Sequence, residues 1–375
     1  MPERFFRRVP GGLAKAPALR SLRAAALRGK ADTGQGPVRV LTITLHGEDL
    51  IFSQESSPPG SPIGRMESRD GVIDWEAETG HVDRNAFWES GAPPAWAADW
   101  GQDRYGPWVE FVIRDVRQRM RWCPPGKFRM GSPADEPGRF DDEGPQHEVT
   151  LREGFWLFDT PVTQGLWRAV MGQNPSRFQG VNRPVEQVSW ANCQAFITRI
   201  NERVSGLMLG LPSEAQWEYA CRAGTITPLY NGPIEIEDHK AALDPIAWYD
   251  ANSNGRTHPV ARKEPNPWGF FDMLGNVWEW TQDHWYVDYR GAPADGTAWE
   301  GLDSEAGADR VYRGGSWGSD ASVVRAAVRN RNRPDIPGIS LGFRCARVHV
   351  SQADKQSGED VDPARPSEAV STAPK

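Results

Sequence analysis

The side chains best suited to bind a soft metal or to attack a substrate belong to four cysteines, Cys123, Cys193, Cys221 and Cys345. Their spacing matches no zinc-binding pattern, and no CxxC pair occurs. A chain of 375 residues has enough apolar side chains for a core and does not need disulfides to fold. We therefore expect four reduced, buried thiols.

The histidines show no metal-binding pattern within the sequence itself. None lies at the HxxxH spacing that places two imidazoles on one face of a helix. Two or three can still converge in the fold as ligands of a new iron site, although isolated histidines are more often ordinary core or surface residues. They are His46, His81, His147, His239, His258, His284 and His349.

A strip of arginines lies near the C-terminal end: Arg325, Arg329, Arg331, Arg333 and Arg344. Such a strip binds an anion, a phosphate or nucleic acid, or it pairs internally with acidic neighbours. These neighbours are Asp303, Glu305, Asp309 and Asp335. Because 43 basic residues face 50 acidic ones, for a net charge of −7, we favour internal pairing and expect no nucleic-acid partner. Likewise, we expect Asp141, Asp142 and Glu143 to form a solvated loop and not a metal site.

These residues need rigid elements to position them, and three helices are expected. Each begins after a capping hydroxyl and ends at a glycine: Thr163 to Gly172, Ser189 to Gly206, and Ser213 to Gly224. Ser213 and Gln216 form a capping box. Residues 38–45, which alternate apolar and polar side chains, and residues 108–116 are expected to be strands.

The composition divides the chain into four parts. Residues 1–37 form a basic and flexible leader, 38–115 an accessory β-rich region, 116–350 the main domain, and 351–375 a disordered tail. The 38 glycines and 31 prolines predict many turns and argue against a helical bundle. No run is apolar enough to cross a bilayer or to serve as a secretory signal, so a cytoplasmic location is expected.

Seven motifs follow one another in the main domain: PPGKFRMGSP, PVTQGLWRAVMG, PVEQVSW, LPSEAQWEYACRAG, NPWGFFDMLGNVWEW, RVYRGGSW and LGFR. Together they resemble the formylglycine-generating-enzyme (sulfatase-modifying factor) domain family. The resemblance implies an α+β, irregular C-type-lectin-like fold. It leaves function open, because the family includes copper-dependent oxidases that convert a substrate cysteine into formylglycine, non-haem iron enzymes that form C–S bonds, and non-catalytic binders.

The resemblance allows the catalytic classes to be compared with this sequence. The oxidases carry a cysteine pair a few residues after RGGS, where this chain has Ser319 and Val324. A hydroxyl and an isopropyl group cannot bind Cu(I) as thiolates do. The iron enzymes take their histidines largely from a separate N-terminal helical domain, whereas the N-terminal part here is expected to be β-rich. We therefore expect neither copper nor iron and no catalytic residue.

The resemblance also implies a structural calcium site around GNVWEW, held by an Asn or Asp, two backbone carbonyls and a Glu. The matching positions are Asp272, Gly275, Val277 and Glu279. An alternative is that Glu279 caps a turn or pairs with an arginine.

The C-terminal stretch resembles the variable region of proteins diversified by retroelements, in which an adenine-directed process rewrites AAY-type codons. Lys, Glu, Gln, Met and Trp cannot arise that way, and none of them occurs from Gly318 to Arg344. A frame of Arg, Gly and Trp would then present exchangeable side chains to a protein or another macromolecular ligand. The expected contact residues are Tyr312, Trp317, Gly318, Ser319, Asp320, Ser322, Val323, Val328, Asn330, Asn332, Ile336, Gly338, Ile339 and Ser340.

The preferred hypothesis is therefore a non-catalytic ligand-binding protein with a variable surface at about 312–340. The alternatives are a metal-dependent oxidoreductase of the same family and a purely structural module. A redox metal would indicate the enzyme, and the absence of both metal and ligand would indicate the structural module.

Overall fold

The computed structural model describes residues 39–45, 48–54, 63–68, 71–76, 93–235, 239–301 and 308–348. The predicted leader and tail lie outside these residues. The chain divides into two compact units, Met1–Pro93 and Pro94–Lys375. In the first unit, four antiparallel strands pair in the order β1-β2-β3-β4. They are Arg39–Leu45, Glu48–Gln54, Ile63–Ser68 and Gly71–Glu76, so the strand expected near residue 38 is confirmed.

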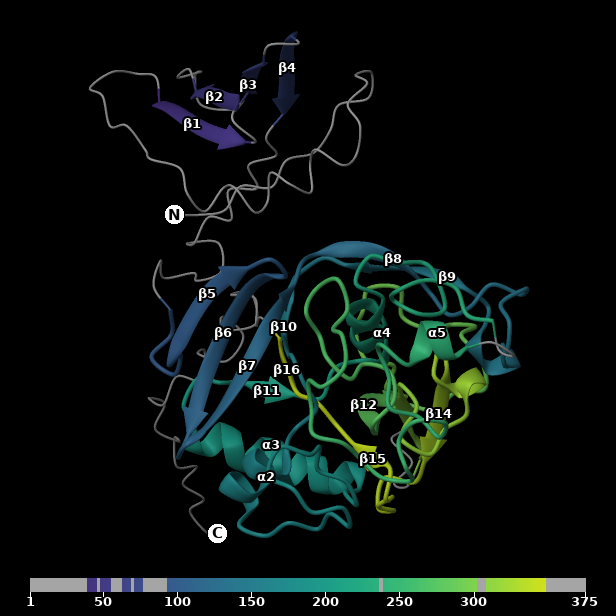
Figure 1. Cartoon of the computed structure of the whole chain (residues 1–375). Coiled ribbons are helices and arrows are strands. Elements are labelled where there is room, and N and C mark those ends of the chain that lie inside the picture. The colour runs from purple at the N-terminus through teal and green to yellow at the C-terminus, as the bar shows by residue number, and fades with distance from the viewer. Residues whose placement is uncertain are drawn as a thin grey trace, which may run out of the picture. The chain divides into compact units, whose positions relative to one another are not determined.

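A six-stranded sheet with the order β11-β16-β10-β7-β6-β5 forms one side of the second unit (Figure 1). Its strands are β5 (Asp99–Asp103), β6 (Gly106–Ile113), β7 (Val116–Cys123), β10 (Phe155–Phe158), β11 (Leu209–Gly210) and β16 (Ala346–Val348). The last described strand, β16, is inserted between β10 and β11. Residues near both ends of the unit therefore meet in one sheet.

The hairpin of β6 and β7 crosses the boundary that the sequence analysis places between residues 115 and 116. The two strands pair from Trp108↔Arg121 to Ile113↔Val116. Because Val109, Phe111 and Met120 are fully buried, the hairpin contributes to the core of the second unit. The structure accordingly places the boundary at Pro93–Pro94. Composition changes near residue 116, but strand pairing continues across it.

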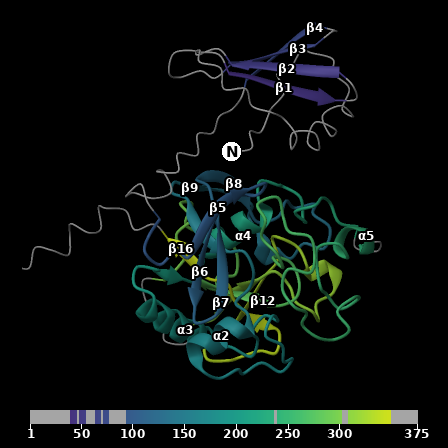
Figure 2. The same cartoon turned by 60° about the vertical axis from the view of Figure 1, so that its left-hand side comes forward.

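Two helices, α2 (Gln164–Met171) and α3 (Trp190–Arg203), contact each other, and α2 contacts β6 and β7 (Figures 1 and 2). Their predicted caps are confirmed: Leu166 N–H donates to Thr163 Oγ1 at 3.2 Å, and Asn192 N–H donates to Ser189 Oγ at 3.1 Å. The second helix ends at Arg203, before the predicted stop at Gly206. The rings of Trp167 and Phe196 stack between the helices, with centroids 5.4 Å apart.

A second sheet has the order β14-β13-β12-β15, in which β12 and β15 run parallel. Its strands are β12 (Trp278–His284), β13 (Arg310–Arg313), β14 (Arg329–Asn332) and β15 (Leu341–Gly342). A separate two-stranded sheet consists of β8 (Gly126–Met130) and β9 (His147–Leu151). Helix α4 (Glu214–Arg222), with the predicted capping box at Ser213, contacts β8, β12 and β13.

The remaining short elements are η2 (Asp141–Glu143), α5 (Lys240–Leu243) and η4 (Ala321–Val323). Long connections with many turns lie between them, as the glycine and proline content predicts. Within the described ranges, all four cysteines are buried and free, which confirms the prediction of reduced thiols. No helix of the described part of the chain is long and apolar enough to cross a membrane.

Gly314 lies at a position where both the backbone conformation and the close packing of the Met273 carbonyl oxygen require a glycine. Its φ of +99° lies in the region that favours glycine, and a Cβ there would lie 2.7 Å from the Met273 carbonyl oxygen. We expect Gly314→Ala to lower the free energy of unfolding by about 1–3 kcal/mol, measured by denaturant titration. Gly318→Ala is the matched control, because a Cβ at Gly318 meets no atom within 4 Å. An equal loss of unfolding free energy in both variants would contradict the conclusion that position 314 requires a glycine.

Candidate functional site

A fully buried arginine, Arg313, joins α4 to the C-terminal part of the second unit. Its Nη1 donates to Glu214 Oε1 at 3.0 Å, and its Nη2 donates to Glu218 Oε2. The same nitrogens donate to the carbonyl oxygens of Ala327 and Ala326 at 3.1 and 2.8 Å. Burial opposes the charged form of Arg313, but the carboxylates of Glu218 and Glu214 outweigh it and raise the pKa of Arg313, so this cation stays charged in the core.

Two more buried arginines repeat this arrangement on either side. Arg329 donates from Nε and Nη2 to both oxygens of Glu214, each at 2.8 Å. Arg325 donates from Nη2 to Glu143 Oε1 at 2.6 Å and from Nη1 to Glu136. Planar two-point contacts of this kind fix orientation as well as position. The segment 325–329 is therefore held to α4 and to the 136–143 loop by charge.

The prediction that the arginine strip pairs internally is confirmed, with partly different partners. Arg331 pairs with Asp309 and Arg333 with Asp335, as expected, at 3.3 and 3.1 Å. The buried arginines instead use glutamates from distant parts of the sequence. Asp303 and Glu305 lie outside the described residues. The expectation that residues 141–143 form a solvated loop is wrong for Glu143, which is fully buried against Arg325.

The predicted contact residues divide into groups, of which the first surrounds Trp317. Its Nε1 donates to the Ile339 carbonyl oxygen at 3.2 Å, and its ring packs edge-on against Phe178 at 5.3 Å between centroids. The N–H groups of Gln187 and Trp278 donate to the carbonyl oxygens of Gly338 and Ser340. The 336–340 turn is thus fixed by its backbone, while Ile336 and Ile339 are 42% and 38% exposed.

A second group lies on the sheet of β12, β13 and β14. Tyr312 pairs with Asn330 across the strands, and its ring contacts Trp278 and Trp280 with centroids 5.1 and 5.4 Å apart. Asn330 is exposed, whereas Tyr312 and Asn332 are half-buried.

The third group follows Trp317 in the chain. Gly318 and Asp320 are exposed, and Ser322 and Val323 are half-buried. The Asp320 carboxylate accepts a hydrogen bond from Ser322 N–H at 2.9 Å and caps η4. These four residues therefore occupy a short, ordered turn.

Two of the predicted contact residues are corrected by their burial. Val328 is only 2% exposed and packs in the core, so its side chain cannot meet a ligand. Ser319 is 8% exposed, and its Oγ accepts a hydrogen bond from Ser316 N–H at 3.0 Å. Buried and exposed positions alternate irregularly in this segment. Because no long helix or strand gives them a regular spacing, the sequence alone does not show that Val328 and Ser319 are buried.

Two aromatic residues beside these groups are absent from the sequence-based prediction. Phe178 packs against Trp317, and Trp190, whose Nε1 donates to the Thr281 carbonyl oxygen at 2.9 Å, lies under Arg310 at 4.1 Å. Trp190 stands in the motif PVEQVSW, which indicated the family but not the position of its ring. Phe178 lies in a loop and Trp190 begins α3, both far earlier in the chain, and no spacing connects them with residues 312–340.

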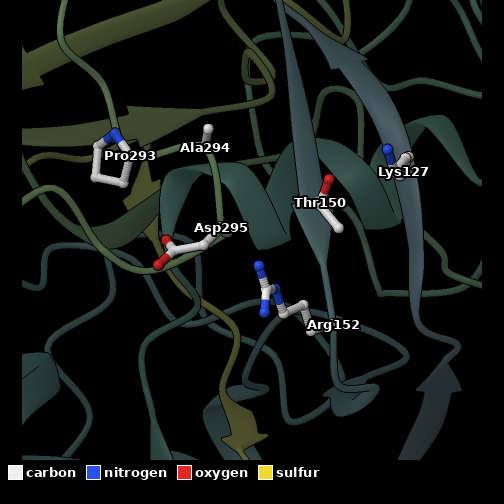
Figure 3. Close-up of a pocket in the computed structure, with 6 residues that line it drawn as sticks. All are labelled: Lys127, Thr150, Arg152, Pro293, Ala294 and Asp295. Carbon is white, nitrogen blue, oxygen red and sulfur yellow. The ribbon is translucent and has the colours of Figure 1, made fainter.

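A separate hollow of about 480 Å³ is shown in Figure 3. It is lined by Lys127, Thr150, Arg152, Pro293, Ala294 and Asp295. Thr150 N–H donates to the Ala294 carbonyl oxygen, and Lys127 forms an exposed ion pair with Glu148. None of its lining residues belongs to the predicted contact set, so the hollow carries no predicted function.

The sulfatase-modifying factor enzyme 1-like domain family matches residues 113–349. The chain belongs to this family. A sulfatase-modifying-factor-like relative, the formylglycine-generating enzyme of Mus musculus, is 33% identical over 218 residues, which cover 56% of this chain and 55% of the relative. The chain thus spans about half the length of the curated relatives that it matches first.

Two solved structures share the fold of this sulfatase-modifying-factor-like chain. Treponema denticola variable protein 1 is 27% identical with a TM-score of 0.54, and the match covers 64% of this chain and 98% of that protein. PvdO from Pseudomonas aeruginosa is 30% identical with a TM-score of 0.56, covering 69% of this chain and all of PvdO. The predicted α+β fold of the formylglycine-generating-enzyme type, similar to that of a variable protein, is confirmed.

The positions of the oxidase cysteine pair lie inside this sulfatase-modifying-factor-like domain. Val324 is fully buried and Ser319 nearly so. The nearest cysteine in the sequence, Cys345, is also buried, and burial raises its pKa well above the ordinary value. In the described part of the chain, no three His, Cys, Asp or Glu side chains converge as metal ligands.

The carboxylates of the predicted calcium site bond to N–H donors. Glu279 accepts from Arg344 Nε at 2.7 Å and Nη2 at 2.8 Å, and from Trp217 Nε1 at 2.8 Å. Asp272 accepts from Ala261 N–H and from the Asn276 amide, and burial raises its pKa to about 6. A guanidinium beside Glu279 also repels a cation, so as they stand the side chains do not fit Ca²⁺.

This arrangement predicts how the protein responds to a chelator. Because Arg344 supplies the positive charge at Glu279, we expect EGTA to leave the thermal midpoint of unfolding unchanged. The measurement is a calorimetric scan of the purified protein with EGTA and with added calcium. A thermal midpoint that falls with EGTA and recovers with calcium would instead support calcium binding at Asp272, Gly275, Val277 and Glu279.

The buried ion pair also predicts a large effect of mutation. Glu279→Gln leaves Arg344 buried beside a neutral amide, which should cost about 3–5 kcal/mol of unfolding free energy. The matched control is Glu148→Gln, because the exposed pair of Glu148 with Lys127 should contribute less than about 1 kcal/mol. Denaturant titration measures both values. Comparable losses would mean that Glu279 does not neutralise Arg344 in the core.

Proposed function

We propose that this protein is a non-catalytic ligand-binding member of its family, with a binding surface formed by exposed residues between 312 and 340. The observation that carries the proposal is the replacement of the copper-binding cysteine pair by Ser319 and Val324, both buried in the frame. Without thiolates at these positions, the chain lacks the soft ligands that the oxidase chemistry requires.

The geometry of the turn supports this proposal. The backbone of residues 338–340 bonds to Gln187, Trp278 and Trp317, and these bonds do not depend on which side chains the turn carries. The exposed side chains of Ile336 and Ile339 can therefore change without loss of the frame. A surface that is already ordered in the free protein loses less conformational entropy when it binds its ligand.

The structural likeness to Treponema denticola variable protein 1 supports the finer proposal of a surface diversified by a retroelement. The absence of Lys, Glu, Gln, Met and Trp from Gly318 to Arg344 agrees with adenine-directed codon change. The ligand we propose is a protein or another macromolecule, because the contact residues lie in open turns and strands.

The identity to a mouse formylglycine-generating enzyme supports a second candidate, a metal-dependent oxidoreductase. The two functions differ in a measurable requirement, since the enzyme needs a redox metal and the binder does not. We expect the purified protein to hold no stoichiometric copper or iron by elemental analysis. We also expect no oxygen uptake with a cysteine-containing peptide. Stoichiometric metal together with oxygen uptake would exclude the binder-only proposal.

The diversified surface has a genetic test. We expect the flanking DNA to hold an imperfect copy of the codons for Arg310 to Arg344, differing only where the copy has adenine, close to a reverse transcriptase gene. Sequencing the locus checks this. A locus without such a copy would remove the retroelement part of the proposal and leave an ordinary member of the family.

Tolerance of mutation is the protein-level test. We expect Ile336→Ser with Ile339→Ser to change the free energy of unfolding by less than about 1 kcal/mol, because both side chains are partly in solvent. The control Val328→Ser, at a buried position within the same segment, should cost more than about 2 kcal/mol. If the exposed pair cost as much as Val328, the turn would belong to the core and could not serve as an exchangeable surface.

A further inference from the structure

The hollow in Figure 3 lies beside the two-stranded sheet of β8 and β9. Lys127 of β8 lies directly opposite Thr150 of β9, and Arg152 follows two residues after Thr150. Residues 293–295 complete the lining from a segment far along the chain. The volume of about 480 Å³ falls within the range of sites that bind small molecules.

The segment that brings residues 293–295 to the hollow is held by its backbone. Thr150 N–H donates to the Ala294 carbonyl oxygen at 2.8 Å, so this segment runs along β9. Ser213 Oγ donates to the Gly296 carbonyl oxygen at 2.7 Å and ties the same segment to the start of α4. The lining is therefore formed before any ligand arrives, which lowers the entropy lost on binding.

The Asp295 carboxylate has a fixed orientation and a free oxygen. Its Oδ1 accepts hydrogen bonds from Thr297 N–H at 3.0 Å and from Thr297 Oγ1 at 2.6 Å. These bonds, and to a smaller extent the charge of Arg152, lower the pKa of Asp295, so the carboxylate is ionised at neutral pH. Oδ2 accepts no hydrogen bond from the described residues and is available to a cationic donor.

Two basic side chains and a hydroxyl line the hollow as well. In Figure 3 the Arg152 guanidinium extends toward the 293–295 segment, and it forms no ion pair or hydrogen bond with a described residue. Lys127 Nζ pairs with Glu148 at 3.0 Å, but both side chains are more than half exposed, so this pair is weak and leaves ammonium donors free. The Thr150 hydroxyl can accept or donate a further hydrogen bond.

This charge arrangement favours a ligand with two opposite charges. A simple anion would be attracted by Arg152 and Lys127 but repelled by Asp295, and a simple cation would meet the reverse. Arg152 and Asp295 line one hollow without forming an ion pair with each other. A zwitterion can bond to both of them, and Pro293 and Ala294 add a short apolar wall for an aliphatic side chain.

We propose that the hollow binds an aliphatic α-amino acid, with its carboxylate bound by Arg152 and Lys127 and its ammonium group by Asp295. The site goes beyond the proposed function, because it takes a small molecule and shares no residue with the surface at 312–340.

The test is calorimetric titration of the full chain with L-leucine at neutral pH. We expect saturable binding that Arg152→Gln and Asp295→Asn each weaken at least about tenfold, because each removes one charge-assisted contact. The matched control is Arg129→Gln, which removes a charge from an exposed position on β8, two residues from Lys127 and outside the hollow. It should change the affinity less than about twofold.

Two analogues of leucine test the requirement for both charges. Isocaproate lacks the ammonium group and isoamylamine lacks the carboxylate, and we expect each to bind at least about tenfold more weakly than leucine. Thermal unfolding of both variants should match that of the wild type, because Asn at position 295 keeps the acceptor for Thr297. The proposal would be overturned by no binding of leucine, by isocaproate or isoamylamine binding as tightly as leucine, or by an equal loss in Arg129→Gln.

Discussion

The buried ion pairs of Arg313 with Glu214 and Glu218 are the interaction on which the second unit depends most. Burying three charges is unfavourable unless each finds a partner with good geometry. Here one guanidinium meets two carboxylates and two carbonyl oxygens, and Glu214 also binds Arg329. Helix α4, β13 and the 325–329 segment must therefore reach their final positions together. The exposed turns on either side take their positions from this charged centre.

The same principle divides the arginines by function. Arg325, Arg329 and Arg344 form buried pairs with carboxylates and hold distant segments together, whereas Arg331 and Arg333 form more exposed pairs with Asp309 and Asp335. A sequence shows both kinds as the same letter. The difference lies in which glutamates the fold brings to each guanidinium: Glu136 and Glu143 come from the 136–143 loop, Glu214 from α4 and Glu279 from β12. In the core of this protein, charge therefore fixes the relative positions of segments that are distant in the sequence.

Local structure was predictable from the sequence where the physics is local. The caps at Thr163, Ser189 and Ser213 defined the starts of three helices, and the seven motifs indicated the family and the α+β fold. The expected boundary near residue 116 was wrong because composition changes there while a local hairpin, β6–β7, continues across it. Prediction also failed where contacts are distant: Glu143 is buried against Arg325, and Val328 packs inward. In a chain with few long elements, no helical or strand period separates buried from exposed positions between 317 and 340. The pairing of Arg344 with Glu279 was likewise only one of two alternatives in the sequence, because the two residues lie in different motifs.

The position of β16 within the six-stranded sheet has a consequence for synthesis on the ribosome. Residues 346–348 form the strand that lies between β10 and β11 and pairs with both. Until these residues are synthesised, β10 and β11 each lack a neighbouring strand on that side. The nascent polypeptide must hold an open sheet edge until nearly all of the domain has left the exit tunnel. Strand pairing over such sequence separation is slow, and unpaired edges attract other chains. We therefore expect a chaperone that binds unfolded chains to cover this edge until β16 has been synthesised and can pair.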